Sequence, residues 1–252
     1  MEENIKSRLI ESLKTQRKLF GDELLTEVDL TLPPRKTSVA EPAPQYKPEI
    51  KVTKKSDPDS FFVEPFQKAK TIDELEKLIN TCKKCPLGVS RTKFVFGSGN
   101  PNADVMVIGE APGAEEDKQG VPFVGRAGKL LTDILKAIDL DREKDVYIAN
   151  ILKCRPPNNR NPLPSEVELC DPYLYKQIDL IKPKAILLLG LVAAQTLLQT
   201  KTSLTKMRGN VFEINGIKTM VTYHPAALLR NPNWKRGCWE DVQIFKKMVD
   251  EQ

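Results

Sequence analysis

Hydrophobic residues gather in four short runs after residue 70, and segments with helical periodicity separate these runs. The runs are DVMVIG (104–109), DVYIANIL (145–152), KAILLLG (184–190) and KTMVTYH (218–224). Short apolar runs of this length are typical of strands that are buried on both faces. Strands that alternate with helices predict right-handed crossovers and a mainly parallel sheet with helices on both faces.

Apolar residues at helical spacing predict the connecting helices. Thr71 and Glu74 match the two positions of a capping box at the start of the first helix. The segment GNVFEINGIKTM has Asn215 and Gly216 at its centre, which predicts a hairpin attached to the last strand. The expected helices cover residues 71–82, 126–138, 165–181, 191–198 and 240–249.

The first 60 residues follow a different pattern. Apolar residues at helical spacing predict a short amphipathic helix over residues 4–20. Six prolines follow within residues 33–58, with almost no large apolar side chains, which predicts a disordered, partly extended linker. We therefore expect one folded domain over residues 61–252. The N-terminal helix is either a docking element for a partner protein or a loosely attached surface helix.

The charge of the chain is modestly basic. There are 39 Lys and Arg residues against 34 Asp and Glu residues, and the first 60 residues hold 11 of each sign. The excess therefore belongs to residues 61–252, where it suits nucleic acid or simply keeps the domain soluble. No apolar run approaches the roughly 20 residues of a membrane span, and the N-terminus lacks the apolar centre of a signal peptide. We expect a cytoplasmic protein.

Four of the five cysteines form two pairs. Cys82 and Cys85 make a C-x-x-C motif, whereas fifteen residues separate Cys154 from Cys170. In a reducing compartment these pairs suit a metal centre better than disulfides. The wide second spacing favours the larger footprint of a [4Fe–4S] cluster over zinc, with four unrelated buried cysteines as a further alternative. Cys238 stands apart and is interpreted as an ordinary thiol.

Unusual residues follow each predicted strand. GEAPGAEED follows the first strand, Asn150 and KCRPPNN end the second, Gly190 follows the third, and Tyr223 and His224 follow the fourth. Ligands of open parallel sheets bind beyond the carboxyl ends of the strands. These residues are therefore candidates for one common site.

Three of these motifs together resemble the family 4 uracil-DNA glycosylases, which carry an iron–sulfur cluster. The motifs are GEAPGAEEDKQGVPFVGRAG (109–128), the C-x-x-C with the two later cysteines around CRPPNNRNP, and TYHPAALLRNP. The resemblance covers about residues 70–250 and leaves out the first 60. It implies an α/β, three-layer α/β/α uracil-DNA glycosylase fold with a central four-stranded parallel sheet.

The same resemblance implies a function and a cofactor. The chain is expected to act as a monomer on uracil-containing DNA in base excision repair, where it removes uracil and leaves an abasic site. A [4Fe–4S] cluster would be held by Cys82, Cys85, Cys154 and Cys170.

The resemblance also implies which residues bind the base. The ring of Phe123 would stack on a uracil that has been flipped out of the helix. A single amide, that of Asn150, can accept from N3–H and donate to O4 of uracil, and it rejects cytosine, which reverses this pattern. Ala111 and Asn159 complete the predicted substrate contacts, although Asn158 and Asn159 are also interpreted as residues that contact the DNA backbone or shape their loop.

Three further residues are candidates for the chemistry. His224, the one histidine of the chain, would donate a hydrogen bond to uracil O2, where negative charge accumulates as the base leaves. Glu110 and Glu116 would stabilise an oxocarbenium-like sugar and orient water, with Glu110 nearer the base. The neighbouring Glu115 and Asp117 are interpreted as a solvated face.

Cations and one wedge residue would complete the DNA interface. The wedge that fills the gap left by the flipped base is Leu228, Leu229 or Arg230. The expected phosphate contacts are Lys153, Arg155, Arg160, Arg230, Lys235 and Arg236.

Two other readings compete with the enzyme. In one, the same fold only binds uracil-containing DNA or forms a stable adduct with it. A related family bonds covalently to the abasic sugar through a histidine in an inserted basic loop, and CRPPNNRNP contains no histidine, which favours turnover. In the other, the domain is a metal-stabilised scaffold that docks through its N-terminal helix and releases no base.

Overall fold

The computed structural model describes residues 10, 14, 17, 51–52 and 64–251. The helix expected over residues 4–20 and the linker over residues 33–58 therefore lie outside the described residues, apart from these isolated positions. The domain described below begins at Glu64.

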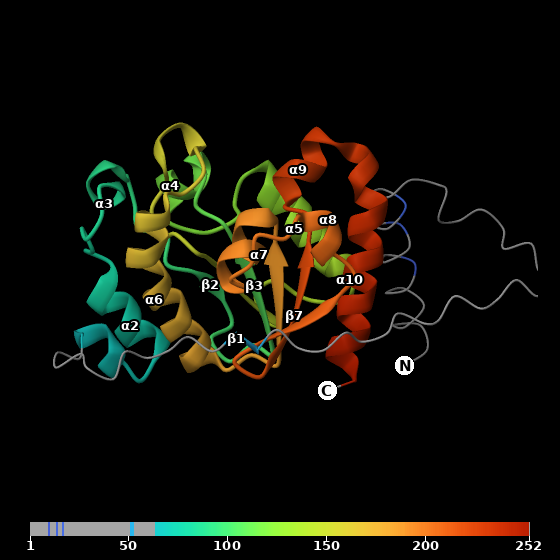
Figure 1. Ribbon diagram of the computed structural model, residues 1–252, viewed down its shortest axis with the longest axis horizontal. Helices are drawn as coiled ribbons and strands as arrows, with labels where there is room; N and C mark the ends of the chain where they lie inside the picture. The colour runs from blue at the N-terminus through green and yellow to red at the C-terminus, as the bar shows by residue number, and fades with distance from the viewer. Residues whose placement is uncertain (1–9, 11–13, 15–16, 18–50, 53–63, 252) are drawn as a thin grey trace, which may run out of the picture.

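A twisted sheet forms the centre of the domain (Figure 1). Four strands run parallel, as predicted, and the structure orders them β7–β5–β3–β4. Shorter strands extend both edges, because β2 pairs antiparallel with β4, β6 pairs antiparallel with β7, and β1 adds to β6. The strands are β1 (Lys51–Val52), β2 (Ser98–Gly99), β3 (Val105–Gly109), β4 (Val146–Asn150), β5 (Ala185–Leu189), β6 (Val211–Ile214) and β7 (Ile217–Thr222).

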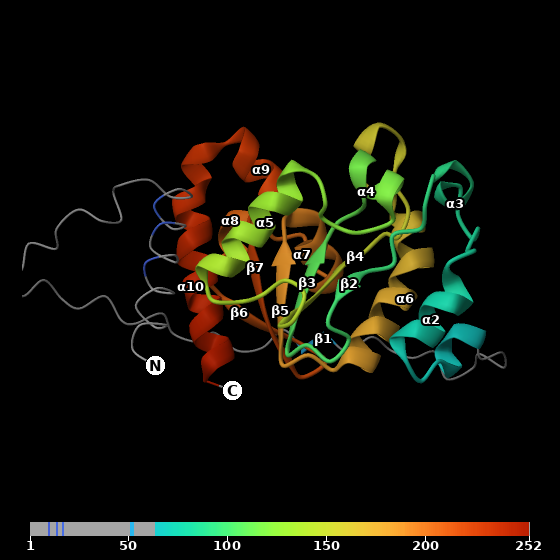
Figure 2. The same ribbon diagram turned by 180° about the vertical axis from the view of Figure 1, so that it is seen from behind.

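Helices cover both faces of the sheet, as Figures 1 and 2 show from opposite sides. One layer contains α2, α6 and α7, and the other contains α5, α9 and α10. The α-helices are α2 (Ile72–Ile79), α3 (Leu87–Ser90), α4 (Ala114–Gln119), α5 (Arg126–Ala137), α6 (Pro164–Ile181), α7 (Leu191–Leu197), α8 (Leu204–Met207), α9 (Pro225–Arg230) and α10 (Lys235–Asp250); short 3₁₀ helices are η2 (Pro65–Lys68), η3 (Pro157–Asn159) and η4 (Pro232–Trp234).

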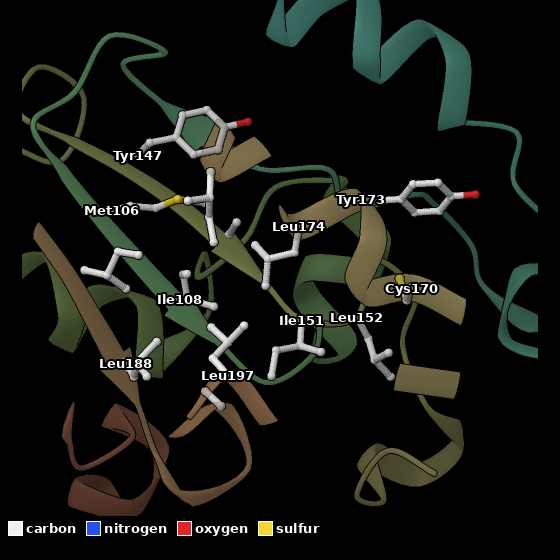
Figure 3. Packing of buried hydrophobic residues seen from close by; sticks show 14 of the residues in the cluster. Met106, Ile108, Tyr147, Ile151, Leu152, Cys170, Tyr173, Leu174, Leu188 and Leu197 are labelled. Atoms are coloured by element: carbon white, nitrogen blue, oxygen red, sulfur yellow. The ribbon is translucent and has the colours of Figure 1, made fainter. Parts of the chain in front are cut away.

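The central strands feed two separate cores, because successive side chains of a strand point to opposite faces. All five residues of β3 are buried. Met106 and Ile108 face the core under α6 and α7, where they meet Leu174 and Leu197 (Figure 3). Their neighbours in β3 face the other core, under α5 and α10. The continuous apolar runs of the sequence thus correspond to strands covered on both faces, which confirms the three-layer prediction.

Local signals set two of the predicted boundaries. Thr71 Oγ1 accepts a hydrogen bond from the backbone N–H of Glu74 at the start of α2, whereas the Glu74 carboxylate reaches the N–H of Lys70, one residue before the expected partner. Asn215 and Gly216 both have positive φ, as a two-residue type I′ turn requires. The hairpin of β6 and β7 is confirmed.

Two boundaries were predicted wrongly. The acidic stretch after β3, which is not among the expected helices, contains α4. The first turn of α4 carries three acidic residues near the positive end of the helix dipole, and its C-cap is Gly120 in the left-handed conformation. Helix α10 begins at Lys235 rather than residue 240, because buried Cys238 and Trp239 extend its apolar stripe toward the N-terminus. No helix of the described residues has both the length and the apolar character needed to cross a membrane.

We predict that α10 is held to the sheet mainly by its buried stripe. Phe245 is fully buried in the core beneath α10, so Phe245→Ala should lower the free energy of unfolding in urea by about 3–5 kcal/mol. Its neighbour Ile244 is 43% exposed, so Ile244→Ala should change that free energy by less than about 0.5 kcal/mol. Equal losses for the two variants would contradict the packing described for α10.

Candidate active site

The carboxyl ends of the parallel strands meet at one edge of the sheet. Gly109 at the end of β3 lies in register with Asn150 at the end of β4. On the other side, Gly190 donates its N–H to the carbonyl of Thr222 at the end of β7, two residues before His224. Strand pairing therefore brings together segments that are far apart in the sequence, as the strand-end rule predicted.

Gly109 provides the space in which two predicted site residues meet. A Cβ atom at this position would lie 2.6 Å from Cζ of Phe123 and 2.5 Å from Oδ1 of Asn150. The phenyl ring and the amide oxygen thus both lie directly against the end of β3. Any larger residue at position 109 would displace one of them.

The segment that carries Phe123 is held in an uncommon conformation. Phe123 is buried and has φ 53°, a left-handed value that is rare for a non-glycine residue. Arg142 donates to the carbonyls of Pro122 and Phe123 at 2.5 and 2.7 Å, and Gly128 lies so close to the Phe123 carbonyl that no Cβ would fit. These contacts compensate the backbone strain and fix the ring.

Asn150 presents a buried oxygen that no described residue satisfies. The side chain is 2% exposed, and its Oδ1 has no hydrogen-bond partner within the described part of the chain. An unsatisfied buried acceptor typically costs about 1–3 kcal/mol. Such a group in a site suits a ligand that brings an N–H donor.

His224 is the N-cap of α9, and its ring is prepared to donate. Nδ1 accepts the N–H of Ala226 at 3.1 Å, so in the neutral ring the proton lies on Nε2. Burial lowers the pKa of His224 to about 4, the positive charge of Arg230 acts in the same direction, and Glu116 opposes both. Its ring centroid lies 5.5 Å from that of Phe123. The imidazole is therefore neutral near pH 7.

The two candidate glutamates have different surroundings. Both oxygens of Glu116 accept backbone N–H groups, from Gly113 at 3.1 Å and from Val124 and Gly125 at 3.0 and 3.2 Å. Glu116 thus ties α4 to the segment after Phe123. The carboxylate of Glu110 is partly buried and accepts no hydrogen bond from a described residue, and burial raises its pKa.

The neighbouring acidic residues divide between the surface and the interior. Glu115 is exposed and pairs with Lys118, which agrees with a solvated face. Asp117 was assigned wrongly to that face, because it is 5% exposed and accepts the backbone N–H groups of Thr92 and Lys93. It anchors the segment before β2 to α4.

Two other residues, Ala111 and Asn159, were predicted to contact the substrate. Ala111 follows Glu110 and packs partly buried against the core under α6. Asn159 is exposed, has a positive φ and accepts a hydrogen bond from Nε of Arg155 at 2.8 Å. This contact shapes its loop, which is one of the three roles predicted for it, and the substrate and DNA-backbone contacts stay predictions.

The four paired cysteines lie together at the α6 end of the domain. Cys154 and Cys170 are buried, with Cys82 and Cys85 packed against the same core. Burial raises the pKa of the Cys154 thiol, the Arg91 hydrogen bond lowers it, and nearby Cys85 and Cys82 raise it further. Cys238, interpreted as an ordinary thiol, lies away from these four cysteines in the opposite core.

Three of these sulfur atoms accept hydrogen bonds. Arg91 donates to Cys154 Sγ at 3.1 Å, the Tyr173 hydroxyl to Cys82 Sγ at 3.3 Å, and the backbone N–H of Lys153 to Cys170 Sγ at 3.4 Å. Among the described residues, no three His, Cys, Asp or Glu side chains gather closely enough to hold a single metal ion.

Comparisons with known proteins agree with this geometry. Residues 96–246 match the model of the uracil DNA glycosylase superfamily. A type-4 uracil-DNA glycosylase of Archaeoglobus fulgidus is 44% identical over 186 residues, which cover 71% of this chain and 92% of that protein. Those of Sulfurisphaera tokodaii and Thermotoga maritima are 47% and 41% identical, over 71% and 74% of this chain and 86% and 99% of theirs. The chain belongs to the type-4 uracil-DNA glycosylases.

The structure of this type-4 glycosylase contradicts some of the predicted DNA contacts. Lys153 is fully buried and donates to groups of the protein interior, so its ammonium cannot reach a phosphate. Leu228 is also fully buried, in the core under α9, so it cannot be the residue that fills the gap left by the flipped base. Leu229 is 43% exposed and Arg230 is exposed, so both stay predicted wedge residues. Arg160 already forms an ion pair with Glu166 at 2.6 Å.

Sequence reasoning missed two residues that support the glycosylase site. Arg142 holds the Phe123 segment from 19 positions away, and no motif of the sequence connects the two. Gly109 had a signal, because it is the first residue of the recognised acidic motif. Its role follows only from the meeting of Phe123 and Asn150 above it.

We predict that the single histidine of this type-4 glycosylase titrates far below its ordinary value of 6.5, with a midpoint near 4. Because the folded pKa is depressed, the neutral ring contributes stability that is present above pH 6.5 and is lost as the pH falls toward 4. The imidazole resonances in a proton NMR titration give the midpoint directly, since the chain contains one histidine.

The control is His224→Gln, which removes the resonances and cannot take up a proton. Between pH 7 and 4, the free energy of unfolding in urea should fall less for this variant than for the wild type, because the variant has no imidazole to protonate. A midpoint near 6.5 would contradict the buried, neutral imidazole.

Proposed function

We propose that this chain flips uracil out of DNA and hydrolyses its N-glycosidic bond, leaving an abasic site for base excision repair. The observation that carries the proposal is the buried, unpaired Oδ1 of Asn150 beside the ring of Phe123. Family membership supports the same activity, since the matched relatives are uracil-DNA glycosylases.

Base recognition requires a stacking surface and a paired donor and acceptor. The flipped base would lie against the ring of Phe123, which the Arg142 contacts hold in place. Oδ1 of Asn150 would accept N3–H of uracil, and Nδ2 would donate to O4. Cytosine offers an acceptor at N3 and a donor at its exocyclic amine, so the same amide orientation excludes it.

Bond cleavage sends an electron pair to the departing base. As the bond between C1′ and N1 breaks, negative charge spreads onto O2 of uracil and positive charge onto the sugar. Nε2–H of the neutral His224 would donate to O2, where its hydrogen bond strengthens as the charge grows. The base leaves as an anion and takes its proton afterwards.

Glu110 is the better of the two glutamates for work on the sugar. Its carboxylate accepts no hydrogen bond from the described residues, so it remains available to stabilise the cationic sugar and to orient the water that adds at C1′. Glu116 uses both oxygens on backbone N–H groups. We assign it to holding the Phe123 segment rather than to positioning water.

We further propose that Cys82, Cys85, Cys154 and Cys170 hold a [4Fe–4S] cluster. Each cysteine of such a cluster binds a different iron atom, so the sulfur atoms lie farther apart than around one zinc ion, consistent with the absence of a single-ion site among the described residues. Donors to three of the sulfur atoms suit thiolate ligands. When bound, the cluster joins the segment after α2 to the start of α6.

The proposed enzyme lies within residues 61–252, since every assigned residue belongs to that range. The N-terminal segment would then take no part in the chemistry, and its helix would be either a docking element for a partner protein or a loosely attached surface helix. A binding-only protein of the same fold would retain the uracil contacts without turnover, and release of the base separates the two.

We predict that incubation with a uracil-containing oligonucleotide, followed by alkali, cleaves the strand at the uracil. Asn150→Asp should slow excision by at least about 10²-fold, because an ionised carboxylate accepts from N3–H but cannot donate to O4. Asn102→Asp makes the same change in an exposed turn at the amino end of β3 and should excise at the wild-type rate. An intact strand with wild-type protein would favour binding alone, and full activity of Asn150→Asp would move base recognition elsewhere.

We predict that the purified protein is brown and contains about four iron atoms per chain. Cys154→Ser and Cys170→Ser should each lose iron and solubility, because each removes a buried ligand of the cluster. The matched control is Cys238→Ser, a buried cysteine of the opposite core, which should retain all of the iron. Colourless protein with one zinc per chain would overturn the cluster.

A further inference from the structure

Lys153 is a fully buried lysine, and along the chain it lies between Asn150 of the base-binding region and Cys154 of the cysteine region. It follows β4, three residues after Asn150 and one before Cys154. A buried ammonium group is costly unless polar partners surround it. Within the described part of the chain, no carboxylate forms an ion pair with it.

The partners of Lys153 are two oxygens of the interior. Nζ donates to the backbone carbonyl of Asn150 at 2.8 Å and to Oε1 of Gln177, in the middle of α6, at 2.5 Å. Gln177 is itself fixed, because its Nε2 donates to the carbonyl of Phe96 at 3.1 Å. The Asn150 peptide is thus tied to α6 through two buried side chains.

The backbone of Lys153 makes a second connection to the same helix. Its N–H donates to Sγ of Cys170 on α6 at 3.4 Å. Figure 3 shows Cys170 and Leu174 of α6 beside Ile151 and Leu152, the residues that lead from β4 to Lys153. One residue therefore connects the end of β4 both to a cysteine and to the body of α6.

Base recognition depends on which way the Asn150 amide points. A rotation that exchanges Oδ1 and Nδ2 would reverse the donor and acceptor and suit cytosine instead of uracil. Because no described residue bonds to Oδ1, the orientation cannot be set by a partner of that atom. The amide lies against Gly109 beside the Phe123 ring, and how it meets them depends on the position of the Asn150 backbone.

We infer that Lys153 is a positioning residue for uracil recognition: its buried ammonium group holds the Asn150 peptide against α6, so that the amide keeps the orientation that reads uracil. The inference rests on the proposed function. It also links the base site to the cysteine region, because Cys170 belongs to the same helix as Gln177.

The first test is Lys153→Met, which keeps the length of the side chain and removes its donors. Single-turnover uracil excision should fall about 10–100-fold, with iron content equal to that of the wild type. In an Asn150→Ala background the same substitution should change the rate less than about twofold, because Lys153 acts through Asn150. Lys184→Met, at an exposed lysine before β5, is the matched control and should leave the rate unchanged.

If Lys153→Met does not fold, a second variant and a second measurement still test the inference. Gln177→Met removes one acceptor of the ammonium group and should slow excision in the same direction. The side-chain amide resonances of Asn150 in nitrogen–proton NMR spectra should be a single sharp pair in the wild type and should shift or broaden in either variant. This readout does not require activity.

Several outcomes would overturn the inference. The first is a full excision rate with unchanged amide resonances in the folded variants. The second is a Lys153→Met variant that slows excision as much in the Asn150→Ala background as in the wild type. The third is loss of iron from Lys153→Met, which would assign the residue to the cysteines. If the wild type itself releases no uracil, the proposed function fails, and the amide resonances still decide whether Lys153 positions Asn150.

Discussion

The absence of a side chain at Gly109 is the constraint on which the site depends. Parallel pairing places the end of β3 beside the end of β4, and only a glycine leaves room there for the Phe123 ring and the Asn150 amide together. The stacking surface and the hydrogen-bonding group thus contact the same point of the sheet. The rest of the domain keeps these two groups from moving, since neither is fixed by the strand alone.

Two networks hold the groups in place from opposite sides. Arg142 and Glu116 bind the backbone around Phe123 and maintain its left-handed conformation. Lys153 and Gln177 bind the backbone of Asn150 from within the core. In both networks a charged or polar side chain bonds to main-chain groups. The backbone of each functional residue is therefore held in place, and Oδ1 of Asn150 is left available.

The sequence predicted the sheet well because its information is local. Strands β3, β4 and β5 are continuous apolar runs, and the turn at Asn215 requires a conformation that its residues favour. Burial of charged side chains was not predictable in this way. Lysine and aspartate side chains are usually exposed, and the interior positions of Lys153 and Asp117 depend on partners such as Gln177 and Thr92, 24 and 25 positions away.

The candidate residues of the site were found through the motifs, whereas their division of work required contacts. Glu110 and Glu116 belong to one acidic motif and cannot be separated by residue type or spacing. The hydrogen bonds separate them, because Glu116 faces three backbone N–H groups and Glu110 faces none of the described donors. Arg142 illustrates the same limit, since its role depends on a contact that no local pattern records.

The distribution of charge explains why a basic chain has its most acidic segment at the site. Burial keeps His224 neutral, and the charge of Glu116 is balanced by backbone dipoles, so little net charge opposes entry of a neutral base. Cationic side chains such as Arg230 and Arg236 remain at the exposed surface around it, where phosphates would bind. Groups that stabilise charge inside the site would then be needed only as the glycosidic bond breaks. In the proposed reaction, a fixed donor at the base and a carboxylate near the sugar would stabilise the separating charges more than they stabilise the bound substrate, and this difference would accelerate the reaction.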